Sequence, residues 1–260
     1  MSLLHLERLR SDCGQAVAVL RLDRPPAHAI SRGLLAELLG ALERIDRDPP
    51  RALVLAATGE KFFSAGLDLL DLFDLDRPAL ETFARELNDF FLRLFRLPFP
   101  VVAAVSGHAI AGGLILSLTA DRRILARGEH LLGLNEGQVG LALPGPLFEV
   151  VRSALGGAAA SEALLEGKNY AAADAIRVGF VHEMVERTEL ETQAIRAAER
   201  MARVPARAFA RMKTLLHGDA EAWIQRTGET TDPFLDIWFD PATREAMERA
   251  RDKLLARKHS

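Results

Sequence analysis

The chain has 260 residues, of which 49% are hydrophobic, 27% charged and 6% aromatic, the composition of a soluble globular protein with one large domain or two small ones. This composition excludes a disordered chain, a collagen-like chain and a disulfide-dense scaffold. The 33 basic and 36 acidic side chains leave a formal net charge of -3, so no overall field favours nucleic acid or an anionic membrane as a partner.

The N-terminal residues and the single cysteine bear on the compartment. Residues 1–10 combine Glu7 with Arg8 and Arg10 and lack a continuous apolar segment, unlike a secretory signal or a transit peptide. Cys13 has no second cysteine with which to form an internal disulfide, so the fold needs no oxidising environment and we expect an inert thiol. We therefore expect a cytoplasmic protein.

Short apolar segments alternate with helical patterns along the first half of the chain. Strands are predicted at 16–22, 52–57, 101–105 and 122–126, which indicates an α/β fold. Two amphipathic helices lie between them, one after Ser31 and one from about Ala79. Their apolar faces carry Leu34, Leu35, Leu38, Leu42 and Ile45 in the first, and Phe83, Leu87, Phe91 and Leu94 in the second. Each face is expected to pack on a sheet.

The segment at 97–120 contains no Asp, Glu, Lys or Arg and is longer than the ~20 residues that cross a bilayer. Two prolines and three glycines interrupt it, at Pro98, Pro100, Gly107, Gly112 and Gly113. Such breaks indicate a buried strand, a turn and a separate helix rather than a membrane span. We expect no membrane insertion.

From about Gly145 onward helical periodicity dominates, apart from a possible strand at 180–185. Helices are predicted at 189–201, 206–216 and 242–257. We therefore expect a sheet-based core over residues 1–195 and a helical C-terminal subdomain over residues 196–260.

Common catalytic motifs are missing. The glycines do not have the spacing of a nucleotide-binding loop or a dinucleotide fingerprint, and the residues at 62–66 lack the first glycine of a nucleophile elbow. The seven histidines show no paired ligand spacing, so no metal site is expected.

Two glycine turns, at 63–69 and 107–113, each follow an apolar segment and open a helix. In that geometry unpaired backbone N–H groups point outward. Two converging donors would form an oxyanion hole, which is worth roughly 3 to 4 kcal/mol per donor to an enolate-like transition state. The alternative is two plain strand-to-helix turns in which glycine supplies backbone freedom. Each turn alone favours this alternative.

A third feature is Glu136, the single charged residue between Leu131 and Gly145. Apolar surroundings raise the pKa of a carboxyl group and make it a candidate general base near neutral pH. A surface glutamate in a short turn is the alternative.

Taken together and in order, these segments resemble a known family. FSAGLDL at 63–69, GHAIAGGLILSLTADRRILA at 107–126 and LGLNEGQVGL at 132–141 are similar to the crotonase (enoyl-CoA hydratase/isomerase) superfamily, and within it to the mitochondrial-type Δ3,Δ2-enoyl-CoA isomerases. The resemblance extends over nearly the whole chain, including Pro25-Pro26 and ADAIRVGFVHEMV at 173–185. It implies a spiral of β-β-α units with a helical C-terminal trimerisation region.

The resemblance also implies a site. The backbone N–H groups of Ala65 and Gly112 would form the oxyanion hole for an acyl-CoA thioester, and Glu136 would be the catalytic acid and base. Contacts with the CoA substrate would come from Ser64, Gly66, Leu67, Asp68, Leu69, Gly113, Ile115 and Pro26. Asp68 is also placed to cap a helix. No tightly bound cofactor is implied, since the CoA thioester is the substrate.

Two positions depart from the family pattern. His28 and Ser106 stand where the family usually has asparagine, and both are expected to be structural. A third position separates the reactions: the hydratases that the chain resembles use two glutamates, the second three residues after Gly112, where this chain has Ile115. No Asp or Glu occurs at 101–120. The sequence thus favours moving the double bond of a 3-enoyl-CoA to the 2 position over hydration.

Alternatives remain open. One is an enoyl-CoA hydratase or another acyl-CoA enzyme, and another is a non-catalytic oligomeric scaffold or RNA-associated relative. The basic residues at 244–258 are interleaved with acidic ones and lack aromatics, which is typical of a solvated helix face rather than a nucleic-acid site.

Two further expectations concern apolar side chains. The acyl pocket is expected to be lined by residues such as Leu72, Phe73, Leu143 and Trp238. Phe234, Ile237 and Trp238 in the helical C-terminal region are expected to need a partner surface, which predicts a homotrimer or a hexamer.

Overall fold

The computed structural model describes residues 2–10, 16–228 and 231–258, so Cys13 lies outside the described residues. Its larger sheet has the strand order β1-β2-β3-β5-β7-β10. These strands are β1 (Leu4–Arg10), β2 (Ala16–Leu22), β3 (Ala52–Ala57), β5 (Val101–Val105), β7 (Arg122–Ala126) and β10 (Glu183–Val185). β1 is antiparallel to β2, and the other neighbours are parallel. The four predicted strands are confirmed with the bounds that the sequence indicated.

A smaller sheet has the order β4-β6-β8-β9. Its strands are β4 (Phe62–Ser64), β6 (His108–Ile110), β8 (Leu131–Gly133) and β9 (Asn169–Ala171). Along the chain, β3, β5 and β7 of the larger sheet are each followed by a strand of the smaller one and then by helix. This repeated β-β-α unit confirms the expected spiral. Because β4, β6 and β8 are parallel, their carboxyl ends meet at one edge of the smaller sheet.

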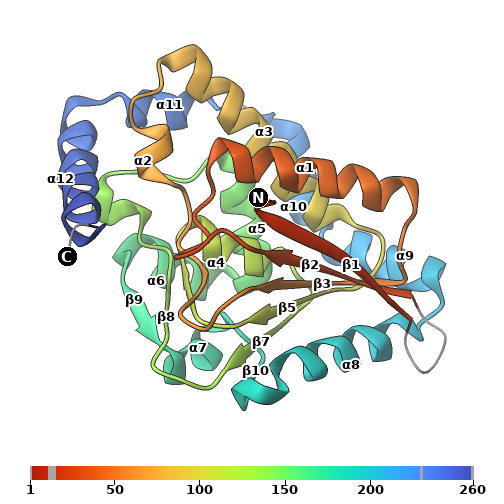
Figure 1. The fold of residues 1–260 in the computed structure, drawn as a ribbon. Helices are drawn as coiled ribbons and strands as arrows, with labels where there is room; N and C mark the ends of the chain where they lie inside the picture. The colour runs from red at the N-terminus through yellow and green to blue at the C-terminus, as the bar shows by residue number, and fades with distance from the viewer. Residues whose placement is uncertain (1, 11–15, 229–230, 259–260) are drawn as a thin grey trace.

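Helices surround both sheets (Figure 1). They are α1 (Arg32–Arg47), α2 (Leu69–Leu72), α3 (Arg77–Arg96), α4 (Gly112–Leu118), α5 (Gly145–Leu155), α6 (Gly157–Glu166), α7 (Ala172–Val178), α8 (Leu190–Ala202), α9 (Ala206–Leu216), α10 (Gly218–Thr227), α11 (Asp232–Trp238) and α12 (Pro241–Lys258), with 3₁₀ turns η1 (Glu136–Val139) and η2 (Arg187–Glu189).

The predicted amphipathic helices begin at side-chain caps. Ser31 accepts a hydrogen bond from the Leu34 amide at the start of α1, and Asp76 accepts one from the Ala79 amide at the start of α3, which satisfies amide groups that a helix leaves free. All nine apolar residues predicted for the two faces are buried.

The larger sheet has apolar side chains on both faces. One face packs with α1 and α3 in the main core, and the other packs against α8 (Figure 1). A parallel sheet that is covered on both sides needs nearly continuous apolar strands, which explains why β3 and β5 are buried at every residue.

The uncharged segment at 97–120 forms β5 and α4, as predicted, and the predicted turn between them contains the short strand β6. No helix within the described residues has the length and apolar character of a membrane span.

The helical C-terminal region corrects one expectation. Phe234 and Trp238 are buried within the single chain and Ile237 is half-buried, because α11 packs on α3. The argument that these residues need a partner is therefore wrong. Three exposed apolar side chains of this region lie together on α9, where Met212, Leu215 and Leu216 are 51%, 61% and 80% exposed.

The division between residues 195 and 196 stays a prediction, and this boundary falls inside α8. Residues from both parts of α8 pack in the core against the larger sheet.

Candidate active site

Three sequence motifs come together because each follows a strand of the smaller sheet. Gly66 follows β4, Gly112 follows β6 and Glu136 follows β8. Parallel strands end at the same edge, where open α/β sheets bind ligands. The Ala111 amide donates to the Gly133 carbonyl, at 2.7 Å, and so links the second motif to β8. A cavity of about 590 Å³ opens at this edge.

The first two turns touch through their backbones. Gly66 has φ +81, and a Cβ there would lie 2.9 Å from the Gly112 nitrogen and from the Ile110 carbonyl oxygen. A Cβ on Gly113 would lie 2.1 Å from the Ser64 carbonyl oxygen. Both positions therefore require glycine, since no side chain fits between the turns.

The geometry corrects the predicted oxyanion donors. The Ala65 amide donates to the Ala27 carbonyl oxygen at 2.9 Å, so it is not available to a ligand. Leu67 and Gly112 both line the cavity, and within the described residues neither backbone amide has a hydrogen-bond acceptor. A Cβ on Gly112 would lie 3.9 Å from the Leu67 nitrogen. Leu67 and Gly112 are therefore the two backbone amides at this place in the wall that remain free to bind a ligand.

Ser64 supports the first turn from behind. It is fully buried, and its hydroxyl donates to the His28 carbonyl oxygen at 2.8 Å and accepts from the Gly66 amide at 3.3 Å. Ser64, Gly66 and Gly113 are absent from the cavity lining. Their predicted substrate contacts are therefore wrong, because they shape the two turns rather than face the cavity.

His28 is structural, as predicted. Its Nδ1 accepts from the Arg24 amide at 3.0 Å, and its Nε2 bonds the Thr58 carbonyl at 2.8 Å. Because Nδ1 accepts a hydrogen bond and Nε2 must donate one, the ring is neutral and carries its proton on Nε2. Burial lowers the pKa of His28, which also favours the neutral ring. Ser106 is also buried, with its hydroxyl 3.5 Å from the Phe62 carbonyl oxygen.

Asp68 lies in the cavity wall but is engaged. One carboxylate oxygen accepts from the Leu70 amide at 3.0 Å and caps α2, and the other pairs with Arg24 at 2.5 Å. The predicted capping role is confirmed. Both carboxylate oxygens of Asp68 are therefore engaged in hydrogen bonds.

Glu136 has the opposite environment. Its side chain is half-buried because it borders the cavity, yet Oε2 is inaccessible to solvent and has no hydrogen-bond partner within residues 2–10, 16–228 and 231–258. Burial raises the pKa of Glu136 to about 7, an effect that a hydrogen bond from its own backbone partly offsets. A carboxyl group that is half ionised at neutral pH can both accept and return a proton.

Apolar side chains form the rest of the wall. Ile115 is buried and lines the cavity. The half-buried Leu69 and Leu143 and the exposed Pro26 line it as well. The other three residues expected in the acyl pocket, Leu72, Phe73 and Trp238, are buried elsewhere in the core and do not line it. The wall includes instead Leu87, Phe91, Leu147, Phe234 and Leu254. The sequence places Leu87 and Phe91 on the apolar face of a helix. This pattern predicts that both are buried, but it does not indicate which buried residues line a cavity.

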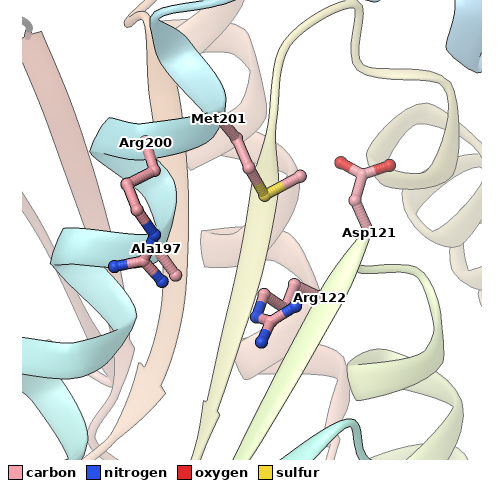
Figure 2. A pocket seen from close by; sticks show the side chains of 5 residues that line it. All are labelled: Asp121, Arg122, Ala197, Arg200 and Met201. Carbon is pink, nitrogen blue, oxygen red and sulfur yellow. The ribbon is translucent and has the colours of Figure 1, made fainter.

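A second, smaller cavity of about 340 Å³ lies between α8 and the start of β7, lined by Asp121, Arg122, Ala197, Arg200 and Met201 (Figure 2). Its carboxylate is engaged, because Asp121 accepts from Lys213 at 2.9 Å and from the Val101 amide at 2.8 Å. Arg122 pairs with Glu183 at 3.1 Å. The larger cavity is therefore the candidate active site. In the described part of the chain, no three metal-ligating side chains gather in one place.

Comparison with known proteins agrees with this geometry. The sequence profile described as enoyl-CoA hydratase/isomerase matches residues 12–239. The chain belongs to the enoyl-CoA hydratase/isomerase family. This assignment confirms the resemblance seen in the three motifs.

Individual relatives carry both names of the family. Human mitochondrial enoyl-CoA delta isomerase 1 is 32% identical over 196 residues, which are 75% of this chain and 65% of the relative, so the match spans just under two thirds of that protein. A probable enoyl-CoA hydratase, EchA17 of Mycobacterium avium, is also 32% identical, over 76% of each chain.

Solved structures of the family have the same fold. The crystal structure of human mitochondrial Δ3-Δ2-enoyl-CoA isomerase superimposes with a TM-score of 0.91 at 27% identity, covering 99% of this chain and 100% of that one. This agreement extends the shared fold to the helical C-terminal region.

Proposed function

We propose that this family member is a Δ3,Δ2-enoyl-CoA isomerase, which moves the double bond of a 3-enoyl-CoA thioester to the 2 position. Glu136 is the acid and base, and the Leu67 and Gly112 amides bind the thioester oxygen. The substrate brings the CoA thioester, and the reaction needs no resident cofactor because it moves only a proton and electron pairs within one molecule.

The reaction follows from these three groups. The Glu136 carboxylate removes a proton from C2, and the electron pair moves into the thioester as a dienolate. The two amides donate hydrogen bonds to the dienolate oxygen, which carries more charge than the thioester oxygen of the substrate, so they lower the barrier. The protonated Glu136 then delivers its proton to C4, and the double bond forms between C2 and C3.

The observation that carries the proposal is the set of carboxyl groups in the wall. Among the described residues that line the cavity only Asp68 and Glu136 are acidic, and Asp68 is engaged with Arg24 and an amide. Ile115 fills the place where the resemblance puts the second glutamate of a hydratase. An isoleucine side chain can neither orient nor deprotonate water, whereas isomerisation requires only one carboxylate.

A panel of 3-enoyl-CoA thioesters of increasing chain length tests this proposal. Each is incubated with the purified protein, and 2-enoyl-CoA and 3-hydroxyacyl-CoA are separated and quantified. We expect 2-enoyl-CoA as the main product for at least one chain length. A protein that binds the thioesters but converts none of them would contradict the proposal and favour a non-catalytic scaffold.

Hydration of 2-enoyl-CoA is the second candidate. It is favoured by one observation, the 32% identity to a probable enoyl-CoA hydratase over 76% of that protein. Hydratase activity would require a water molecule held without a second free carboxylate. Formation of 3-hydroxyacyl-CoA at a rate above that of isomerisation would support this candidate.

We also propose that the protein assembles as a homotrimer or a hexamer. The support is the exposed apolar face of α9, formed by Met212, Leu215 and Leu216, because an apolar patch of this kind is typical of an interface. Light scattering at micromolar concentration should give a multiple of three chains. A stable monomer would contradict the proposal.

A further inference from the structure

Two side-chain hydrogen bonds tie the turn that carries Glu136, η1, to the rest of the chain. Gln138 donates from Nε2 to the Gly167 carbonyl oxygen at 2.6 Å, and Thr243 donates from its hydroxyl to the Gly140 carbonyl oxygen at 3.1 Å. In the part of the chain that the structure describes, Oε2 of Glu136 has no hydrogen-bond partner. The place of the carboxylate is therefore set by the backbone of η1 and by whatever fixes that backbone.

The contact between Gly140 and Thr243 is close. Gly140 ends η1 with φ +78, and a Cβ there would lie 3.0 Å from the Thr243 hydroxyl and 3.2 Å from the Thr243 Cα. Thr243 is only 7% exposed. The first turn of α12 thus packs directly on the end of the turn that carries Glu136.

Thr243 is itself fixed. Asp240 accepts hydrogen bonds from the amides of Ala242 and Thr243 at 2.9 and 3.2 Å and so caps α12. Arg244, the next residue, donates to the Phe73 carbonyl oxygen at 2.7 Å, and its guanidinium lies 3.6 Å from the centre of the Phe73 ring.

This anchor ties α12 to the other half of the site. Phe73 ends α2, the short helix that follows the Leu67 turn, and α12 stands beside α2 in Figure 1. Leu254, near the far end of α12, lines the cavity. One helix therefore contacts the oxyanion side, the Glu136 turn and the cavity.

We propose that Thr243 is a positioning residue for Glu136. Its hydroxyl holds Gly140, and the Leu141 amide that follows donates to the Glu136 carbonyl oxygen at 3.0 Å, so a shift of Gly140 moves the catalytic turn. The Leu67 and Gly112 amides lie on other turns and keep their places. Loss of the hydroxyl therefore slows proton transfer and leaves thioester binding intact. The inference rests on the proposed isomerase function.

Three variants test the role of the hydroxyl. Thr243→Val removes it at nearly constant volume and Thr243→Ser keeps it. Thr227→Val is the matched control, because the Thr227 hydroxyl donates to the Trp223 carbonyl oxygen of its own helix, at 2.9 Å. We expect Thr243→Val to lower kcat about 10- to 100-fold, as small displacements of a catalytic group do, with KM within about twofold. The serine variant should recover most of kcat, and the control should match the wild type.

A further variant and a measurement that requires no turnover distinguish the positioning of Glu136 from a general loss of structure. Gly140→Ala disturbs the same contact from the opposite side and should lower kcat in the same way. The Glu136 carboxyl is also titrated by infrared difference spectroscopy against Glu136→Gln in the same background, which requires no turnover. The other charged side chains in the cavity wall are Arg24, Lys61 and Asp68, and none of them is changed.

The titration midpoint should lie near 7 in the wild type and lower in Thr243→Val, because a displaced turn admits water to the carboxyl group. The positioning role would be overturned if Thr243→Val or Gly140→Ala folds and keeps both the titration midpoint and the kcat of the wild type. Full activity of Glu136→Gln is a different result, since it would reject the proposed function itself.

Discussion

The two halves of the cavity are built in different ways. One side is made by the backbone: Gly66 and Gly113 let two turns touch, and Leu67 and Gly112 line the cavity. The other side depends on one side chain, Glu136, whose Oε2 has no hydrogen-bond partner among the described residues and whose position is set by its turn. The difference fits the proposed isomerisation, in which the thioester oxygen would stay in one place while the carboxylate would serve both C2 and C4.

The largest effect is expected for a change of Glu136, the one side chain on which its half of the cavity depends. Glu136→Gln removes the base but keeps the size of the side chain, so kcat should fall by about 100- to 10,000-fold, the range for a lost general base. Binding of an acyl-CoA, measured by calorimetry, should change little. If the variant retains more than about a tenth of wild-type kcat, Glu136 is not the general base.

A smaller loss is expected on the backbone side. In Gly112→Val the Cβ would lie 3.9 Å from the Leu67 nitrogen, where it crowds the thioester oxygen, and kcat should fall about 100- to 1,000-fold, as for a lost oxyanion donor. Ser106→Ala is the control, because Ser106 is buried behind the turns. Similar mild effects of both changes on kcat/KM would show that the oxyanion hole lies elsewhere.

The unpartnered carboxylate should also leave a signature in stability. The pKa of Glu136 is raised from 4.5 to about 7 in the folded chain, so the native state binds more protons than the unfolded state between these values. Stability from this group therefore decreases as the pH rises through that window, by at most about 3 kcal/mol at 1.36 kcal/mol per unit.

Denaturant unfolding of the wild type and Glu136→Gln at several pH values measures this effect. The glutamine variant should be the more stable protein at pH 8, and the difference should shrink as the pH falls toward 5. A difference that does not vary with pH would mean that the Glu136 carboxyl titrates near its ordinary value.

The smallest effect concerns the apolar wall between the two halves. Ile115→Glu places a second carboxyl group one helical turn beyond Gly112 and should raise the ratio of hydration to isomerisation, even though both rates fall because a buried charge without a partner is costly. Both products are followed from one 2-enoyl and one 3-enoyl thioester. An unchanged ratio would show that Ile115 does not face the place of a hydrating water.

The sequence predicts the larger sheet better than the site. The strands at 16–22, 52–57, 101–105 and 122–126 have five to seven residues each, most of them buried, and each has the predicted bounds. The strands of the smaller sheet have three residues each, too few to show a period, so β4 and β6 were predicted as parts of turns.

The site shows the same limit at the level of single atoms. The environment of Glu136 could be predicted because its neighbours in sequence are uncharged. The sequence could not show which of the two amides, Ala65 or Leu67, is free to bind a ligand. That depends on the hydrogen bond from the Ala65 amide to the Ala27 carbonyl oxygen, which joins segments far apart in the chain. The sequence around Thr243 does not indicate a role in the site either, because its partner Gly140 lies 103 positions away in the chain.

The central claim is that one free carboxylate and two backbone amides make this cavity an isomerase site. The most direct test is the ratio of two initial rates for the wild-type protein: formation of 2-enoyl-CoA from 3-enoyl-CoA, and formation of 3-hydroxyacyl-CoA from 2-enoyl-CoA of the same chain length. Both are measured above pH 7, where Glu136 is mostly ionised. The account predicts that isomerisation is the faster reaction. Hydration that outpaces isomerisation at every chain length would contradict it.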